Sequence, residues 1–220
     1  MKPVVLINPN SSKQTTTAML GIARQHLPSV VGWTNSNAPR MITDPSALTA
    51  AAEDIASATV PEACALIVAA FGDPGAKRLG ARVEIPVIGI GAAAARAACQ
   101  GHVPFAVVTT TPKLGPAIDA LMQSEGDGFL GCFFTEGDPE TLTADPTALD
   151  PALIKACEQA ALAGARRVII GGGPLATAAA RIAPTVPVSL VQPLVAACQE
   201  VASRTGHLVP RAPDRSRSAH

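Results

Sequence analysis

The chain has 220 residues, enough for one large α/β domain or for two domains of about one hundred residues each. Its 17 Lys and Arg balance its 17 Asp and Glu, and its only aromatic side chains are one Trp and five Phe. A neutral chain has no overall field to attract a polyanion, and so few rings offer little surface for stacking bases. We therefore expect neither nucleic acid nor a membrane as a partner.

The five cysteines form no recognisable pattern. They are widely spaced, without a CxxC pair, at Cys64, Cys99, Cys132, Cys157 and Cys198. This spacing favours neither a disulfide framework nor a zinc site, and the four His are scattered, so no metal site is predicted. The N-terminal apolar run is too short for a signal peptide or a membrane span, which predicts a cytoplasmic protein.

Short apolar runs alternate with longer Ala-rich stretches, which is typical of strands alternating with helices in a parallel sheet. In chain order the pattern predicts a strand at 4–7, a helix at 46–58, strands at 66–70 and 87–90, a helix at 92–99, a strand at 105–108, a helix at 152–163, strands at 168–170 and 186–191, and a helix at 193–203.

The chain also resembles itself. VVLINPN (4–10) parallels FAVVTTT (105–111) at an offset of 101, and IVAAFGDPG (67–75) parallels IIGGGPLA (169–176) at 102. IPVIGI (85–90) parallels VPVSLV (186–191) at 101, and AACQ occurs at 97–100 and again at 196–199. Four features in nearly the same register predict two similar α/β halves related by a pseudo-two-fold axis.

The predicted division of the chain follows from this repeat. The first half comprises residues 1–98 and the second residues 99–203, with a C-terminal helix that could pack back on the first half. The Arg-rich segment 204–220 is predicted to be a disordered basic tail.

Four strand ends are candidates for a binding cleft, because ligands bind beyond the carboxyl ends of strands in parallel sheets. The segments 8–12, 70–75, 109–111 and 172–174 are rich in small or hydroxyl-bearing residues. Their N–H and hydroxyl groups suit a small anion or a flat polar ring. The candidate substrate-binding residues are Asn8, Asn10, Ser11, Phe71, Gly72, Thr109, Thr110, Gly173 and Pro174.

Each segment also has a purely structural interpretation. The first could be only a capped strand-to-helix turn, with Ser11 or Ser12 as the cap. Asp73, the only acid in the four segments, is either an Asx-turn or cap residue, which we favour, or a catalytic acid or base. The Gly-rich run at 171–173 lacks the GxGxxG spacing and the later acid of a dinucleotide site.

The motifs INPNSS, AAFGDPG followed by IPVIGI, FAVVTT, and a Gly-rich turn followed by VPV together resemble the Asp/Glu/hydantoin racemase superfamily, in particular its hydantoin and allantoin racemase branch. The resemblance covers residues 3–203. It implies the Asp/Glu racemase fold, an α/β architecture of two pseudo-symmetric, Rossmann-like parallel-sheet halves with the active site between them. It also implies a small-molecule substrate, no cofactor and a homo-oligomer.

The resemblance further implies a reaction that uses two cysteines on opposite faces of the substrate. One thiolate removes a proton from the carbon next to a carbonyl, and the other thiol returns a proton to the far face. The first thiol usually precedes Phe-Gly-Asp-Pro-Gly, where this chain has Ala70, and the second lies in a Gly-rich turn, where it has Gly172. Both catalytic positions are therefore non-reactive here.

We accordingly expect a cofactor-independent enzyme of this family that acts on a small carboxylate-, amide- or hydantoin-like substrate, at a carbon next to a carbonyl, without two-cysteine racemisation. Asp73 is the candidate acid or base. Two alternatives stay open, namely a catalytically inactive binding or regulatory homologue, and a decarboxylase, lyase or hydrolase on the same scaffold.

Overall fold

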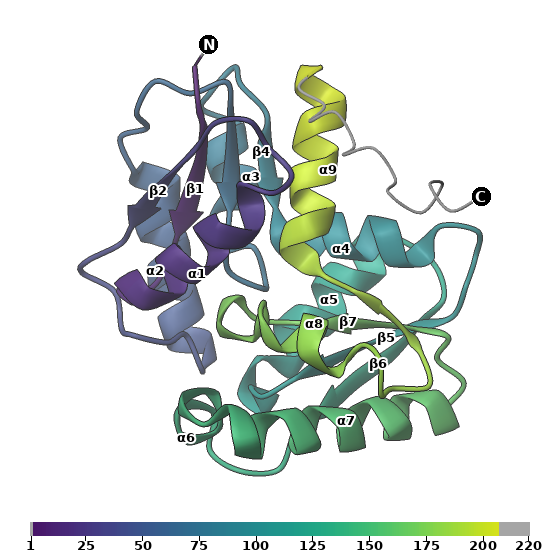
Figure 1. Cartoon of the computed structure of the whole chain (residues 1–220). Helices are drawn as coiled ribbons and strands as arrows, with labels where there is room; N and C mark the ends of the chain where they lie inside the picture. Colours follow the sequence, from purple (N-terminus) through teal and green to yellow (C-terminus); the bar gives the residue numbers. More distant parts are fainter. Residues whose placement is uncertain (1, 207–220) are drawn as a thin grey trace, which may run out of the picture.

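The computed structural model describes residues 2–206 and contains two four-stranded parallel sheets with helices packed on them (Figure 1). The first sheet has the strand order β2-β1-β3-β4, formed by β1 (Val4–Asn8), β2 (Val30–Thr34), β3 (Ala65–Val68) and β4 (Val87–Gly89). The second has the equivalent order β6-β5-β7-β8, formed by β5 (Phe105–Thr109), β6 (Phe129–Phe134), β7 (Arg167–Ile170) and β8 (Ser189–Val191). The predicted α/β fold of two pseudo-symmetric parallel-sheet halves is confirmed.

The helices follow the strands in both halves. They are α1 (Lys13–Ala23), α2 (Pro45–Ser57), α3 (Ala76–Gly80), α4 (Ile90–Cys99), α5 (Gly115–Glu125), α6 (Pro139–Ala144), α7 (Pro146–Leu162), α8 (Ala178–Ile182) and α9 (Pro193–Thr205), with the short 3₁₀ turns η1 (Pro112–Leu114) and η2 (Gly173–Leu175).

Helices α7 and α9 extend beyond their predicted bounds, and α2 and α4 begin one and two residues before theirs. Helix α7 begins at Pro146 because the Asp145 carboxylate accepts the N–H of Thr147 and caps the first turn. Helix α9 continues to Thr205 and ends at Gly206, which has a left-handed φ of 71°. The start of the predicted tail is therefore helical, and residues 207–220 lie outside the described residues.

The strand pairing shows how the halves correspond. Val4 pairs with Ala65 in the first sheet as Phe105 pairs with Arg167 in the second. Strands β1 and β5 are thus related by an offset of 101 residues, and β3 and β7 by an offset of 102. Both offsets agree with the first two sequence parallels.

The third parallel is wrong by two residues. Leu66 pairs with Val87 as Val168 pairs with Leu190, so β4 and β8 are related by an offset of 103 rather than 101. The repeated AACQ, at an offset of 99, therefore does not mark equivalent positions in α4 and α9. A duplicated chain drifts in this way when short insertions accumulate in its loops, where they are tolerated.

The sequence pattern did not predict β2 and β6, which are the strands at one edge of each sheet. Both are edge strands with a glycine in the middle, and each exposes an apolar side chain, Val31 at 45% and Leu130 at 46%. Both sequences, VVGWT and FLGCFF, are otherwise apolar, but glycine is depleted in strands and interrupts each run.

Helices α4 and α9 are exchanged between the halves. Helix α9, yellow in Figure 1, packs against α1, β3 and β4 of the first half, whereas α4 packs against α5, β7 and β8 of the second. Leu194 and Val201 of α9 belong to the same buried cluster as Val4 and Leu6 of β1. Each sheet is therefore covered on one face by a helix that follows a strand of the other sheet.

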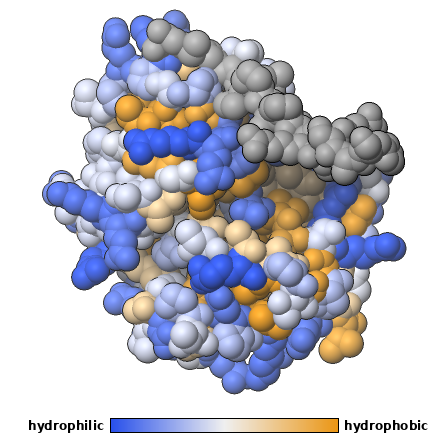
Figure 2. Space-filling model, in the orientation of Figure 1, coloured by the Kyte–Doolittle hydropathy of each residue, from blue (hydrophilic) through white to orange (hydrophobic). Residues whose placement is uncertain are grey.

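On the face seen in Figure 2, hydrophilic residues lie along most of the outline and hydrophobic residues are more frequent inside it. No helix within residues 2–206 is long and apolar enough to cross a membrane.

Candidate functional site

A small cavity lies where the carboxyl ends of β3, β5 and β7 meet. Its volume is about 40 Å³, and residues from all four predicted loops line it. The predicted residues that it brings together are Asn10, Ala70, Phe71, Thr109, Thr110, Gly172, Gly173 and Pro174. Four others, Asn8, Ser11, Gly72 and Asp73, do not line it.

Asn8 is fully buried and holds the first loop together. Its amide nitrogen donates to Asn10 Oδ1 at 2.9 Å and to Thr16 Oγ1 at 3.0 Å, while its Oδ1 accepts the N–H of Asn10 at 3.2 Å. Ser12 rather than Ser11 caps α1, because its hydroxyl accepts the N–H of Thr15. Asn8 and the serines thus shape this turn, as the structural interpretation of the loop expected.

The polar side chains that face the cavity are threonines and one asparagine. Asn10 Oδ1 already accepts hydrogen bonds from Asn8 and Ser12, so its amide nitrogen is the group left for a ligand. The hydroxyls of Thr109 and Thr111 bond to each other at 3.2 Å. Thr110, only 1% exposed, has no side-chain hydrogen bond within residues 2–206. Asn10 and Thr110 can therefore donate to a carboxylate or carbonyl oxygen.

Asp73 caps the helix that follows β4. Its two carboxylate oxygens accept the N–H groups of Gly91 and Ala92, each at 2.7 Å, from the first turn of α4. A Cβ at Gly89 would lie 2.2 Å from this carboxylate, so the close approach requires glycine there. The catalytic role considered for Asp73 stays a prediction, and these contacts weigh against it because they occupy the group away from the cavity.

Burial raises the pKa of Asp73 to about 6. The backbone N–H groups of Ala92 and Gly91 lower the pKa, but they do not outweigh the loss of solvation. Glu125 raises the pKa further, and Arg96 lowers it. A carboxyl group in this position changes charge in mildly acidic solution.

The two thiol positions differ in what they would accept. Ala70 lines the cavity and is 8% exposed. Gly172 has a φ of 143°, which L side chains rarely adopt, and a Cβ there would meet Leu175 at 3.4 Å. The second position has thus lost not only the thiol but also the backbone conformation that a cysteine prefers.

None of the five cysteines lines this cavity. Cys157 and Cys198 are buried in α7 and α9, and burial raises the pKa of each thiol to about 12. Burial also raises the pKa of Cys132, as does the neighbouring Asp119. These three thiols are therefore protonated near neutral pH and are poor nucleophiles or bases.

A wide groove adjoins the cavity. Its volume is about 590 Å³, and it shares Met41, Gly173 and Pro174 with the cavity. Arg40 lies on the first-half side and Glu140 on the second-half side, and neither forms an ion pair within residues 2–206. Sequence reasoning missed Arg40 and Met41 because it missed β2, whose carboxyl end leads into this loop.

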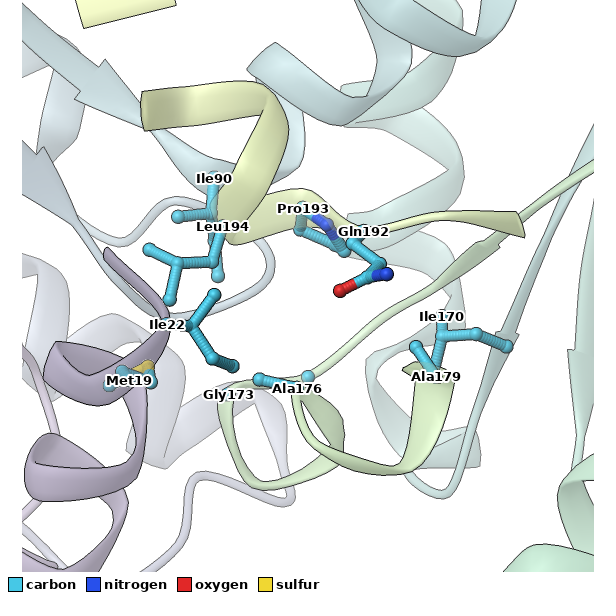
Figure 3. A pocket seen from close by; sticks show the side chains of 11 residues that line it. Met19, Ile22, Ile90, Ile170, Gly173, Ala176, Ala179, Gln192, Pro193 and Leu194 are labelled. Atoms are coloured by element: carbon cyan, nitrogen blue, oxygen red, sulfur yellow. The ribbon is translucent and has the colours of Figure 1, made fainter. Parts of the chain in front are cut away.

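Behind the Gly-rich turn lies an apolar pocket with room for about one water molecule, about 10 Å³ (Figure 3). Met19 and Ile22 of α1 face Leu194 of α9 across it, and Gln192 is its one lining residue with a polar side chain. Gly172 and Gly173 separate this pocket from the cavity and line both.

Residues 2–206 contain no group of three or more His, Cys, Asp or Glu that could hold a metal ion. The residues around the cavity are amides, hydroxyls and apolar groups, which offer a cation no anionic ligand.

Comparison with known proteins gives a consistent family. The family model of the Asp/Glu/Hydantoin racemases matches residues 4–201. The allantoin racemase of Pseudomonas fluorescens is 21% identical, with a TM-score of 0.82 and 99% of both chains covered. The allantoin racemase of Klebsiella pneumoniae is 23% identical, with a TM-score of 0.82 and coverage of 94% of this chain and 88% of that one.

A mutant of arylmalonate decarboxylase is 11% identical, with a TM-score of 0.70 and coverage of 94% and 93% of the two chains. At these identities the solved structures show a shared fold. The comparison with curated proteins found no match.

Proposed function

The chain belongs to the Asp/Glu/hydantoin racemase family, and on this premise we propose that it binds a small carboxylate-, amide- or hydantoin-like molecule between its halves without exchanging a proton through two thiols. This is the binding homologue among the alternatives that the sequence left open.

The observation that carries the proposal is the composition of the cavity wall. Inversion of a stereocentre by two bases needs an ionisable group on each face of the substrate. The residues that line the cavity include no Asp, Glu, His, Cys, Lys or Arg. Ala70 and Gly172 occupy the positions where the family resemblance places the two thiols, and the backbone at Gly172 disfavours any side chain.

Binding is supported by the donors that remain. Asn10 Nδ2 and the Thr110 hydroxyl can hold one oxygen-bearing end of a ligand in the inner cavity. At about 40 Å³ that cavity takes only this end, because ligand sites usually measure about 300 to 1,000 Å³. The rest of the molecule would occupy the adjoining groove near Arg40.

The test is ligand binding followed by proton exchange. Hydantoin, allantoin, succinate and aspartate are screened by thermal shift, since a ligand that binds only the folded state raises Tm. Thr110→Val should remove the shift, whereas Thr147→Val, an exposed threonine on α7, should keep it. For each hit, NMR in D₂O should show no loss of the proton on the carbon next to the carbonyl. Exchange of that proton, or no hit in any class, would contradict the proposal.

Decarboxylation is the second candidate, and one feature of the cavity favours it. Ile42, Leu114 and Ile118 form an apolar wall beside the threonine hydroxyls. An apolar wall destabilises a carboxylate, and nearby donors stabilise the enolate that forms when the C–C bond breaks and CO₂ leaves. Because no ionisable residue lines the cavity, the enolate would then take its proton from water. Release of CO₂ from phenylmalonate by the protein, abolished in Thr110→Val, would replace the binding proposal with this one.

A further inference from the structure

Three residues form the boundary between the inner cavity and the wide groove. Within residues 2–206, Met41, Gly173 and Pro174 are the residues that line both spaces. Gly173 has no side chain, and the ring of Pro174 is held within the 3₁₀ turn η2. A methionine side chain has three rotatable bonds and adapts its shape readily. Met41 is therefore the residue of this boundary whose side chain can open or close it.

The Met41 side chain reaches across the cleft. Met41 follows β2 of the first half, and its Sδ lies 3.9 Å from Oγ1 of Thr143, in α6 of the second half. The Thr143 hydroxyl donates to the carbonyl of Pro139 in its own helix at 2.8 Å, so its one proton is already used. The sulfur and the hydroxyl thus meet in a van der Waals contact, which is individually weak. Met41 rests against the opposite wall without being fixed to it.

The backbone that carries Met41 is fixed, whereas the opposite wall is loosely packed. The carbonyl of Pro39 accepts the N–H of Ser11 at 3.0 Å. Ile42 is 8% exposed and belongs to the same buried cluster as Phe71. Every residue of α6, in contrast, is at least partly exposed to solvent. Opening the boundary therefore needs only a rotation of the Met41 side chain away from α6, and no movement of one half against the other.

We propose that Met41 determines which ligands reach the inner cavity, because its side chain closes the boundary with the groove and lets only a narrow end of a ligand pass. A planar group such as a carboxylate passes, whereas a ring is held back in the groove. The ligand is that of the proposed function, on which this inference rests. The closure itself belongs to the free protein and is tested without a ligand.

The experiment uses the thiol introduced by Ala70→Cys as a reporter, because Ala70 lines the cavity. All variants also carry Cys64→Ala, so that the tryptic peptide 41–77 contains one thiol. Methyl methanethiosulfonate and the wider benzyl methanethiosulfonate are reacted with each variant, and mass spectrometry of this peptide gives the two rates. The acidity of the thiol affects both reagents alike, so the ratio of the methyl rate to the benzyl rate reports the width of the opening.

The ratio should be high while Met41 is present. An open state that is the minor one is populated at about 10% or less, so Met41→Ala should lower the ratio by about fivefold or more. Met41→Leu keeps most of the bulk of the side chain and should keep a high ratio. Gln14→Ala is the matched control, because Gln14 is exposed and lines the groove but not the cavity. It should leave the ratio unchanged.

An unchanged ratio in Met41→Ala, or an equal fall in Gln14→Ala, would overturn the inference. The outcome is separate from that of the proposed function. A fall confined to Met41→Ala, with no ligand found by thermal shift, would support the closure and reject the proposed function. A ligand that binds, together with a ratio that does not respond to Met41→Ala, would support the proposed function and reject the closure.

Discussion

The ring of Phe71 lies directly over Gly171, where an added Cβ would come within 2.7 Å of the ring carbon Cε1. Phe71 follows β3 of the first half and Gly171 follows β7 of the second, so the contact joins the two halves beside the cavity. It leaves no space for a side chain at position 171.

Gly171→Ala should destabilise the protein by about 1–3 kcal/mol, because the ring must move to admit the methyl group. Gly21→Ala is the control, since a Cβ in this part of α1 meets nothing within 4 Å, and the better helix propensity of Ala should stabilise by about 0.5–1 kcal/mol. Urea denaturation measures both. If Gly171→Ala unfolds at the parent's urea concentration, the ring is not fixed as described.

Restoring the thiols should reveal the difference between the two positions. Ala70→Cys adds one atom beside a cavity and should change stability little, whereas Gly172→Cys must hold a side chain at a φ of 143° and should cost about 1–3 kcal/mol. The double variant should not exchange the proton next to a carbonyl in D₂O. If the double variant is stable and racemises a bound hydantoin, then this chain lacks only the two thiol side chains and keeps a backbone at position 172 that accepts a cysteine.

Asp73 should make the protein less stable as the pH rises. Its folded pKa of about 6 lies above the reference value of 3.8, so the folded state binds more protons between these pH values than the unfolded state does. The contribution to stability is therefore present below about pH 4 and is lost as the pH rises through 6. From pH 4 to pH 7, the parent should lose about 2–3 kcal/mol relative to Asp73→Asn.

This dependence is measured by urea denaturation at a series of pH values. Asp127→Asn, an exposed aspartate, is the control and should follow the parent at each pH. A constant difference between the parent and Asp73→Asn from pH 4 to pH 7 would show that the Asp73 carboxyl is not desolvated in solution.

Arg96 should contribute more to stability than a typical surface arginine. It reaches from α4 to Glu200 of α9, at 2.8 Å, and to Glu125 of α5. Arg96→Met leaves the partly buried Glu125 without a partner and leaves Glu200 paired only with Arg204, and it should cost about 1–2 kcal/mol, and less at high salt. Arg78→Met, which removes an exposed pair with Glu53, should change Tm little. Equal effects of the two substitutions would show that Arg96 does not hold the three helices together.

The fold was predictable from the sequence where strands are buried on both faces. Every residue of β1 and of β5 is buried, and such strands appear as unbroken apolar runs. The runs of β2 (VVGWT) and β6 (FLGCFF) are each interrupted by a central glycine, a residue depleted in strands, and the loop that follows β2 was overlooked with it. The exchange of α4 and α9 was not predictable in detail, because an Ala-rich helix shows which of its faces is apolar but not which sheet it covers.

The position of the site was predictable, but the roles of its side chains were not. Asn8 and Asn10 occur in one short turn, and only the structure shows that Asn8 points into the turn toward Thr16. Asp73 reaches α4 because Gly89 and Gly91 leave room for its carboxylate. Contacts between segments that lie far apart along the chain decide both cases, and a local pattern cannot show them.

The exchange of helices also determines the order in which the molecule can be completed. Helix α9 covers one face of the first sheet, yet a ribosome makes it after every strand of both sheets. While the chain is being synthesised, Val4 and Leu6 lack the apolar neighbours Leu194 and Val201. The half that is made first therefore finishes folding last, and the growing chain exposes an uncovered sheet face that needs protection from aggregation until synthesis ends.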